Sequence, residues 1–174
     1  MMKPHKEKEY KMMITKENYD FLIESLSLKT NIQTNYYYST NNSKFAMRIR
    51  EIDDSFIFTL KEKQDGYKNE YEFNIKDNSL NDERITELLS RFSIQNPVYE
   101  GLMKTTRSIM NMKYGEFCLD KSEYLGITDY EIEYELYDAS IDNNDEFMDL
   151  LKNNNLIYKE SEKSKYGRFV EAKK

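Results

Sequence analysis

Apolar and polar residues alternate along several stretches of the chain, and this period of two predicts β-strands. In the first stretch, EKEYKMMI at 7–14, an apolar face lies opposite a face that carries Glu7, Glu9 and Lys11. Turn-forming residues such as NNS, DD, KYG and GIT separate the later stretches. Further strands are therefore predicted at 33–40, 44–52, 55–63, 67–75, 101–112, 116–125, 129–136 and 165–172.

Three other stretches have apolar residues at the spacing of an amphipathic helix. They are 15–26, 81–92 and 144–155, and Thr15 is the expected N-cap of the first. The combination predicts an α+β fold with many antiparallel strands and about three helices. No repeat or change of composition divides the chain, so one domain over residues 1–174 is expected.

Many of the predicted strands have one densely ionised face. The helices need apolar surfaces to pack on, so the apolar faces must lie together and the ionised faces must share the other side of the sheet. A sheet of about eight strands can leave that side in water, or it can close into a barrel around a charged tunnel. The residues involved are Glu7, Glu9, Lys11, Arg48, Arg50, Lys61, Lys63, Glu70, Glu72, Glu131, Glu133 and Glu135.

The signs of these charges are consistent with a bound polyanion. Arg48 stands next to Arg50 on one face, as Glu131 does to Glu133, and like charges repel unless an oppositely charged group lies between them. Arginine and lysine suit phosphate oxygens, while grouped carboxylates suit Mg²⁺ or Mn²⁺. The alternative interpretation is a solvated sheet with scattered surface ion pairs.

Composition narrows the choice of function. The net charge of −6 and pI near 5.1 argue against a duplex nucleic acid partner. Cys118 and His5 are the only residues of their types, which excludes an intrachain disulfide and a multi-cysteine zinc site and disfavours a Ser-His-Asp mechanism. The N-terminal residues lack the apolar core of a signal peptide, and no apolar run suits a membrane span. A soluble cytoplasmic protein without a membrane partner is expected.

The order of the charged motifs resembles the CYTH superfamily, the triphosphate tunnel metalloenzymes named for a class of bacterial adenylate cyclase and for thiamine triphosphatase. EKEYK at 7–11 matches the E-x-E-x-K signature of the first strand. The resemblance covers nearly the whole chain and implies a closed antiparallel barrel, with helices outside and a charged tunnel inside. The later motifs follow in family order: RIR at 48–50, TLK at 59–61, NEYEF at 69–73, TTR at 105–107, CLD at 118–120, YEIEYE at 130–135 and a basic C-terminal strand.

The resemblance also implies roles for individual residues. A divalent metal, Mg²⁺ or Mn²⁺, would be bound by Glu7, Glu9, Glu70, Asp120, Glu131 and Glu133. The triphosphate would be bound by Lys11, Arg48, Arg50, Lys61, Arg107, Lys165 and Arg168. The catalytic set would be Glu7, Glu9, Lys11 and Glu133.

Some positions of the matched motifs leave alternatives open. Lys163 is close enough in sequence to compete with Lys165, and Glu72 and Glu135 are either site residues or rim residues. Thr105 stands where some family members have a lysine, and Lys104, one position away, would point outward from a regular strand.

The expected activity is metal-dependent hydrolysis of a triphosphate compound, namely inorganic triphosphate or a nucleoside or thiamine triphosphate. Phosphoryl transfer depends mainly on positioning and charge neutralisation, so water can attack the terminal phosphate without a side-chain nucleophile. Two alternatives remain. One is a class IV-type adenylate cyclase, in which the 3′-hydroxyl of ATP replaces water, and the other is a non-catalytic protein that binds nucleotides or polyphosphate.

Overall fold

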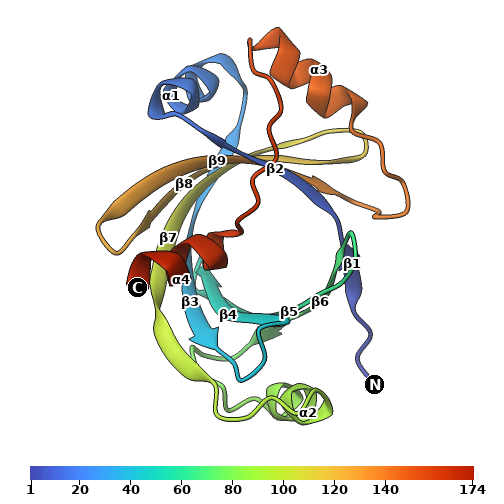
Figure 1. The fold of residues 1–174 in the computed structure, drawn as a ribbon, viewed down its shortest axis with the longest axis vertical. Helices are drawn as coiled ribbons and strands as arrows, with labels where there is room; N and C mark the ends of the chain where they lie inside the picture. Colours follow the sequence, from blue (N-terminus) through green and yellow to red (C-terminus); the bar gives the residue numbers. More distant parts are fainter. The chain divides into compact units, whose positions relative to one another are not determined.

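The structure is a computed structural model that describes all residues, 1–174. It contains nine strands and four helices (Figure 1). The strands are β1 (His5–Glu7), β2 (Glu9–Ile14), β3 (Lys29–Ser39), β4 (Phe45–Ile52), β5 (Ser55–Lys63), β6 (Lys68–Ile75), β7 (Val98–Asn111), β8 (Gly115–Tyr124) and β9 (Ile127–Leu136). The helices are α1 (Lys16–Ser25), α2 (Glu83–Arg91), α3 (Asp145–Asn153) and α4 (Lys165–Lys173).

All nine strands belong to one sheet, in the order β1-β6-β5-β4-β3-β7-β8-β9-β2. The two strands at the ends of this order follow one another in the chain, with only Lys8 between them. The strand order is therefore circular, as it is in a barrel, and the predicted α+β antiparallel barrel is confirmed. The first predicted strand is divided at Lys8, which is one reason why the structure has nine strands.

The chain forms two compact units, and the first consists of residues 1–6 and 32–104. In this unit β4, β5 and β6 pair side by side, and α2 covers one face of them (Figure 1). The turn between β4 and β5 has positive φ at Asp53 and Asp54, which is the geometry of a tight hairpin. The apolar core under α2 includes Ile49, Phe58 and Leu60, none of which is exposed to solvent.

The second unit consists of residues 7–31 and 105–174. Here β9 pairs with β8 on one side and with β2 on the other. Helices α1 and α3 cover one face of these strands, and α4 lies on the opposite face (Figure 1). The core under α1 and α3 includes Leu22, Tyr134 and Phe147, and the rings of Tyr134 and Phe147 stack with centroids 5.0 Å apart.

The N-caps of the helices follow from local sequence. Thr15 accepts a hydrogen bond from the Asn18 amide at 3.1 Å, as its position before α1 predicts. Asp82 accepts from the Arg84 amide at the start of α2. None of the four helices has the length and apolar character that a transmembrane helix requires.

The prediction of a C-terminal strand at 165–172 is wrong, because this segment is helix α4. Ser164 caps the helix by accepting a hydrogen bond from the Gly167 amide at 3.0 Å. Its buried residues, Lys165 and Phe169, are four positions apart and lie on one face of the helix. The helix count is therefore four, where about three were predicted.

Candidate active site

Three buried carboxylates form the centre of the charged face of the second unit. The turn at Leu125 and Gly126, both with positive φ, sets the β8–β9 register and pairs Asp120 with Glu131. Glu133 lies two residues further along the same face of β9. Oxygens of these three carboxylates lie within 4.8 Å of one another. Asp120 and Glu131 are fully buried and Glu133 is 6% exposed, so their charges need close partners. We call this group the inner acidic cluster.

Lys165 contacts every member of the inner acidic cluster. Its ammonium nitrogen lies 2.7 Å from Asp120 Oδ2 and 2.6 Å from Glu131 Oε1, and it also donates to Glu133. The side chain is 7% exposed, so this is a buried ionic contact. The ammonium therefore occupies the place of a cation shared by three carboxylates.

Two arginines complete the surroundings of the inner acidic cluster. Arg107 on β7 donates to both oxygens of Asp120 at 2.8 and 2.7 Å, and to Glu133 at 2.8 Å. Arg168 on α4 donates to Glu131 at 2.5 Å and to Asp129 at 2.9 Å. These contacts satisfy the buried carboxylates from two separate elements.

The helical form of α4 explains how two of these cations reach the same group. Lys165 and Arg168 are three positions apart, so they share one face of a helix, whereas they would point to opposite faces of a strand. Lys163 lies before the helix, is exposed, and pairs with Glu171 at 2.7 Å. Lys165, and not Lys163, therefore contacts the inner acidic cluster.

A second acidic group lies on β1, β2 and β9. Oxygens of Glu7, Glu9 and Glu135 lie within 4.8 Å of one another, and Glu9 pairs with Glu135 in the β2–β9 register. Glu135 thus belongs to this group, which the sequence left open. Lys11 connects the two acidic groups, because its ammonium lies 2.7 Å from Glu9 and its register partner is Glu133.

Burial and ion pairing shift the pKa values of these groups in different directions. Burial raises the pKa of Glu131 to about 7, although Lys165 acts to lower it. Burial acts in the same direction on Glu133, but Lys165 and Arg107 outweigh it and hold the pKa of Glu133 well below its usual value. Glu131 is therefore the carboxylate of this pair that more readily binds a proton.

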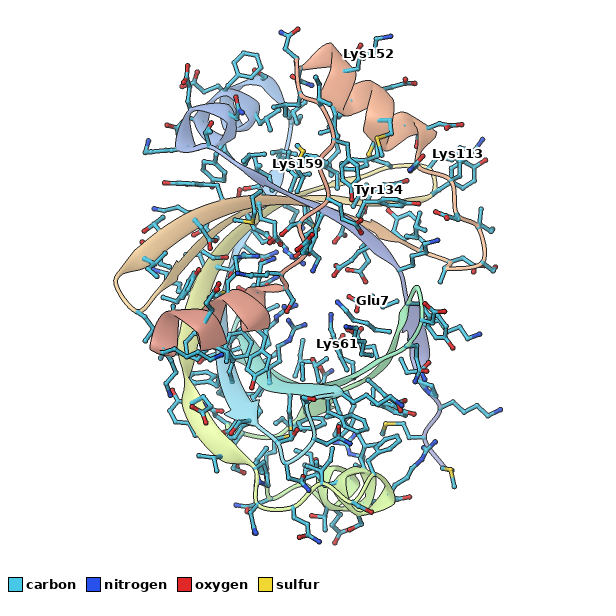
Figure 2. The ribbon with its side chains drawn as sticks, in the orientation of Figure 1. Glu7, Lys61, Lys113, Tyr134, Lys152 and Lys159 are labelled. Atoms are coloured by element: carbon cyan, nitrogen blue, oxygen red, sulfur yellow. The ribbon has the colours of Figure 1, made fainter.

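The first unit carries a cationic face on β4 and β5, on the side away from α2. Figure 2 shows Lys61 on this side of its strands. Lys61 pairs with Glu70 at 3.1 Å, and the Nε atom of Arg50 donates to Asn35 at 2.8 Å. Burial acts to raise the pKa of Glu70, but Lys61 and Arg48 outweigh it and keep that pKa below its usual value. Within its unit, Glu70 is therefore a partner of cations.

Two buried donors on this face have no acceptor. They are the Nε atom of Arg48 and the Nδ2 atom of Asn35. Arg50 and Asn35 are register partners on β4 and β3, and Arg48 lies two residues from Arg50 on the same face. Buried donors in native proteins nearly always have a partner, so this face has capacity for an acceptor such as an anion.

The structure also shows the surroundings of Lys104, Thr105 and Glu72, whose roles the sequence left open. Lys104 is exposed and Thr105 is buried, where its hydroxyl lies 3.1 Å from that of Ser122. Glu72 is exposed and accepts a hydrogen bond from Thr59 at 3.0 Å.

Comparison with known proteins identifies the family. The family model of the CYTH domain matches residues 5–170. The chain belongs to the CYTH family. The resemblance found in the charged motifs is thereby confirmed.

Relatives of this CYTH chain match it over almost its full length. It is 28% identical to a Bacillus subtilis (strain 168) protein named "Putative triphosphatase YjbK", with 95% of each chain covered. It is 27% identical to the crystal structure of "a putative adenylate cyclase" from Bacillus halodurans, with a TM-score of 0.79 and 94% and 98% of the two chains covered. A Hippeastrum protein, HpAC1, described as having a dominant triphosphatase activity, is 21% identical, covers 95% of each chain and has the same fold, with a TM-score of 0.73.

Two polar partners in the CYTH chain were not predicted from the sequence. Asp129 pairs with Arg168, and Asn35 pairs with Arg50. Asp129 could have been found, because it continues the alternating acidic face of Glu131 and Glu133 by two residues. Asn35 had no such signal, since an isolated amide in a tyrosine-rich strand does not indicate its partner.

Proposed function

We propose that this CYTH protein is a metal-dependent hydrolase of triphosphate compounds, in which water attacks the terminal phosphate. The unpaired buried donors of Arg48 and Asn35 carry the proposal, because a phosphate oxygen is the acceptor that a cationic face favours. The 28% identity to a protein named as a triphosphatase supports the same substrate class.

The cations are assigned to the substrate, which is a small-molecule triphosphate. Arginine binds two phosphate oxygens at once, whereas lysine supplies a mobile point charge. All of residues 1–174 would act as one functional domain. The proposed triphosphate ligands are Lys11, Arg48, Arg50, Lys61, Arg107, Lys165 and Arg168.

The carboxylates are assigned to a divalent metal, Mg²⁺ or Mn²⁺. The donor set fits, because both ions prefer oxygen ligands and each acidic group offers three carboxylates within 4.8 Å. A bound metal would neutralise phosphate charge and activate water. The proposed ligands are Glu7, Glu9, Glu70, Asp120, Glu131 and Glu133, and the proposed catalytic set is Glu7, Glu9, Lys11 and Glu133.

The nucleophile is assigned to water and not to a side chain. Cys118 lies near the inner acidic cluster as the register partner of Glu133, but burial raises the pKa of its thiol well above the usual value. A buried thiol of this kind is a poor nucleophile, because the thiolate is the reactive form. His5, the only histidine, is exposed in the short strand β1 and is not assigned a role in this chemistry.

The test is a phosphate-release assay on purified protein with tripolyphosphate, ATP, GTP and thiamine triphosphate, each with Mg²⁺ or Mn²⁺. The proposal expects phosphate release from at least one compound and loss of release with excess chelator. Full activity in chelator would contradict the metal assignment. Cyclic AMP and pyrophosphate from ATP, without phosphate release, would favour the cyclase alternative that the Bacillus halodurans structure's name suggests. Binding without turnover would favour the non-catalytic alternative.

A further inference from the structure

Lys165 and a divalent metal cannot use the inner acidic cluster at the same time. The lysine ammonium lies 2.7 Å from an oxygen of Asp120 and 2.6 Å from an oxygen of Glu131, and it contacts Glu133 as well. A metal ion bound to the same oxygens would sit about 2.1 Å from each. The two cations would then overlap, so one must leave when the other binds.

We propose that Lys165 is an internal competitor of the metal, which keeps the inner acidic cluster closed until a triphosphate draws the ammonium away. This inference rests on the proposed function for the identity of the polyanion. It adds an order of binding, because the free protein would bind metal weakly at this cluster and the substrate would open the site.

The charges around the cluster support competition. Four carboxylates, Asp120, Asp129, Glu131 and Glu133, form ion pairs with three cations, Arg107, Lys165 and Arg168. Lys11 lies beside Glu133 in the β2–β9 register, but its ion pair is with Glu9. The cations already neutralise most of the acidic charge, so the cluster in this state attracts a metal only weakly. Without the Lys165 ammonium, four carboxylates would face two cations, and the attraction for a divalent ion would increase.

The lysine can leave without the helix that carries it. Phe169 is fully buried beside Tyr124, with ring centroids 6.3 Å apart, and Ser164 caps the first turn, so α4 is anchored independently of the ion pairs. A lysine side chain is a flexible stem with a point charge at its end. Phosphate oxygens are strong acceptors for that charge, so a triphosphate can replace the carboxylates as its partner.

The first experiment measures Mn²⁺ binding without substrate, from the electron paramagnetic resonance signal of free Mn²⁺. Wild type, Lys165→Met, Lys165→Arg and Lys163→Met are compared, with circular dichroism as the folding check. Lys163 is the matched control, because it lies two residues earlier, is exposed and pairs with Glu171. We expect Lys165→Met to bind Mn²⁺ on the order of tenfold more tightly than wild type, within the usual range of coupling between sites. Lys165→Arg and Lys163→Met should resemble wild type. The second acidic group can bind Mn²⁺ as well, so the whole binding curve is compared, and a folded Lys165→Met in which no Mn²⁺ site is tighter than in wild type would overturn the proposal.

The second experiment uses only the wild-type protein and does not depend on how Lys165→Met folds. Lysine acylation is followed by mass spectrometry with and without Mn²⁺. We expect Lys165 to react slowly without metal and faster at Mn²⁺ concentrations that saturate binding, while Lys163 reacts at one rate throughout. Mn²⁺ binding that leaves the Lys165 rate unchanged would overturn the proposal. Neither readout needs turnover, so a protein that shows competition but hydrolyses no triphosphate would contradict only the proposed function.

Discussion

The guanidinium of Arg107 and the carboxylate of Asp120 form a two-point contact, with Nε 2.8 Å from Oδ1 and Nη2 2.7 Å from Oδ2. Asp120 is fully buried on β8, and the contact joins it to the neighbouring strand β7. The same guanidinium reaches Glu133 at 2.8 Å. Arg107 therefore stabilises the inner acidic cluster in the folded protein, in addition to its proposed role in binding the triphosphate.

We expect Arg107→Ala to lower the free energy of unfolding by about 3–5 kcal/mol, because it leaves a buried carboxylate without its main partner. Arg107→Lys should lower it by about 1–3 kcal/mol, since a lysine keeps the charge but not the paired hydrogen bonds. Urea unfolding measures both. Arg84→Lys on α2 is the control, because Arg84 makes a similar two-point contact with Asp82, at 3.0 and 2.7 Å, but its side chain is 49% exposed, so this substitution should change stability little. An Arg107→Lys protein as stable as wild type would show that the two-point contact contributes nothing.

Glu9→Gln should reduce phosphate release by about a hundredfold or more while the protein stays folded, because a carboxylate near the developing charge is replaced by a neutral amide. Glu9 belongs to the second acidic group and contacts Lys11 at 2.7 Å, but it contributes nothing to the apolar core. Phosphate release from tripolyphosphate at saturating Mn²⁺ and circular dichroism give the two readouts. Glu24→Gln on α1, which is exposed, should have wild-type activity. Near-normal turnover in Glu9→Gln would remove Glu9 from the proposed metal ligands.

Arg50→Lys should lower activity by about tenfold or more, although the charge is kept, because a lysine cannot contact two phosphate oxygens in the same way. The substitution also removes the Nε donor that now binds Asn35 at 2.8 Å. Thermal melts with and without tripolyphosphate, in excess chelator to prevent turnover, should show a smaller ligand-induced rise in melting temperature for the variant. An equal rise in both proteins would mean that Arg50 does not contact the phosphates.

The pKa of Glu131 predicts how the stability of the metal-free protein depends on pH. Burial raises this pKa from 4.5 to about 7. At a pH between these two values the carboxyl group of Glu131 is protonated in the folded protein and ionised in the unfolded chain. The contribution of Glu131 to stability is therefore present below pH 4.5 and decreases as the pH rises towards 7.

Glu131→Gln mimics the protonated carboxyl group, so its stability relative to wild type should increase from pH 5 to pH 8. The change should be on the order of 1–3 kcal/mol. Urea unfolding in chelator across this pH range measures it, with Glu24→Gln as the exposed control. A stability difference that is constant with pH, or that moves the other way, would contradict the raised pKa.

The sequence by itself determined most of the secondary structure and the division of each strand into an apolar and an ionised face. Both are local properties, because the period of two in a strand and of 3.6 in a helix can be read from neighbouring residues. The β4–β5 and β8–β9 hairpins are local features of the same kind. Their tight turns set the registers that align Arg48 with Thr59 and Asp120 with Glu131.

Tertiary structure decided which charged residues meet. Lys165 and Glu131 are 34 positions apart, and their contact depends on where α4 packs. The C-terminal segment itself was wrongly predicted as a strand, since a mixed run such as KYGRFVEA suits either period. In the helix Lys165 and Arg168, three positions apart, both reach Glu131, which a strand would not allow. Glu135 joined Glu7 and Glu9 for the same reason, because only strand pairing brings them together. An alternating pattern specifies the face on which a charge lies, whereas its partner is set by the packing of distant segments, where burial makes pairing necessary.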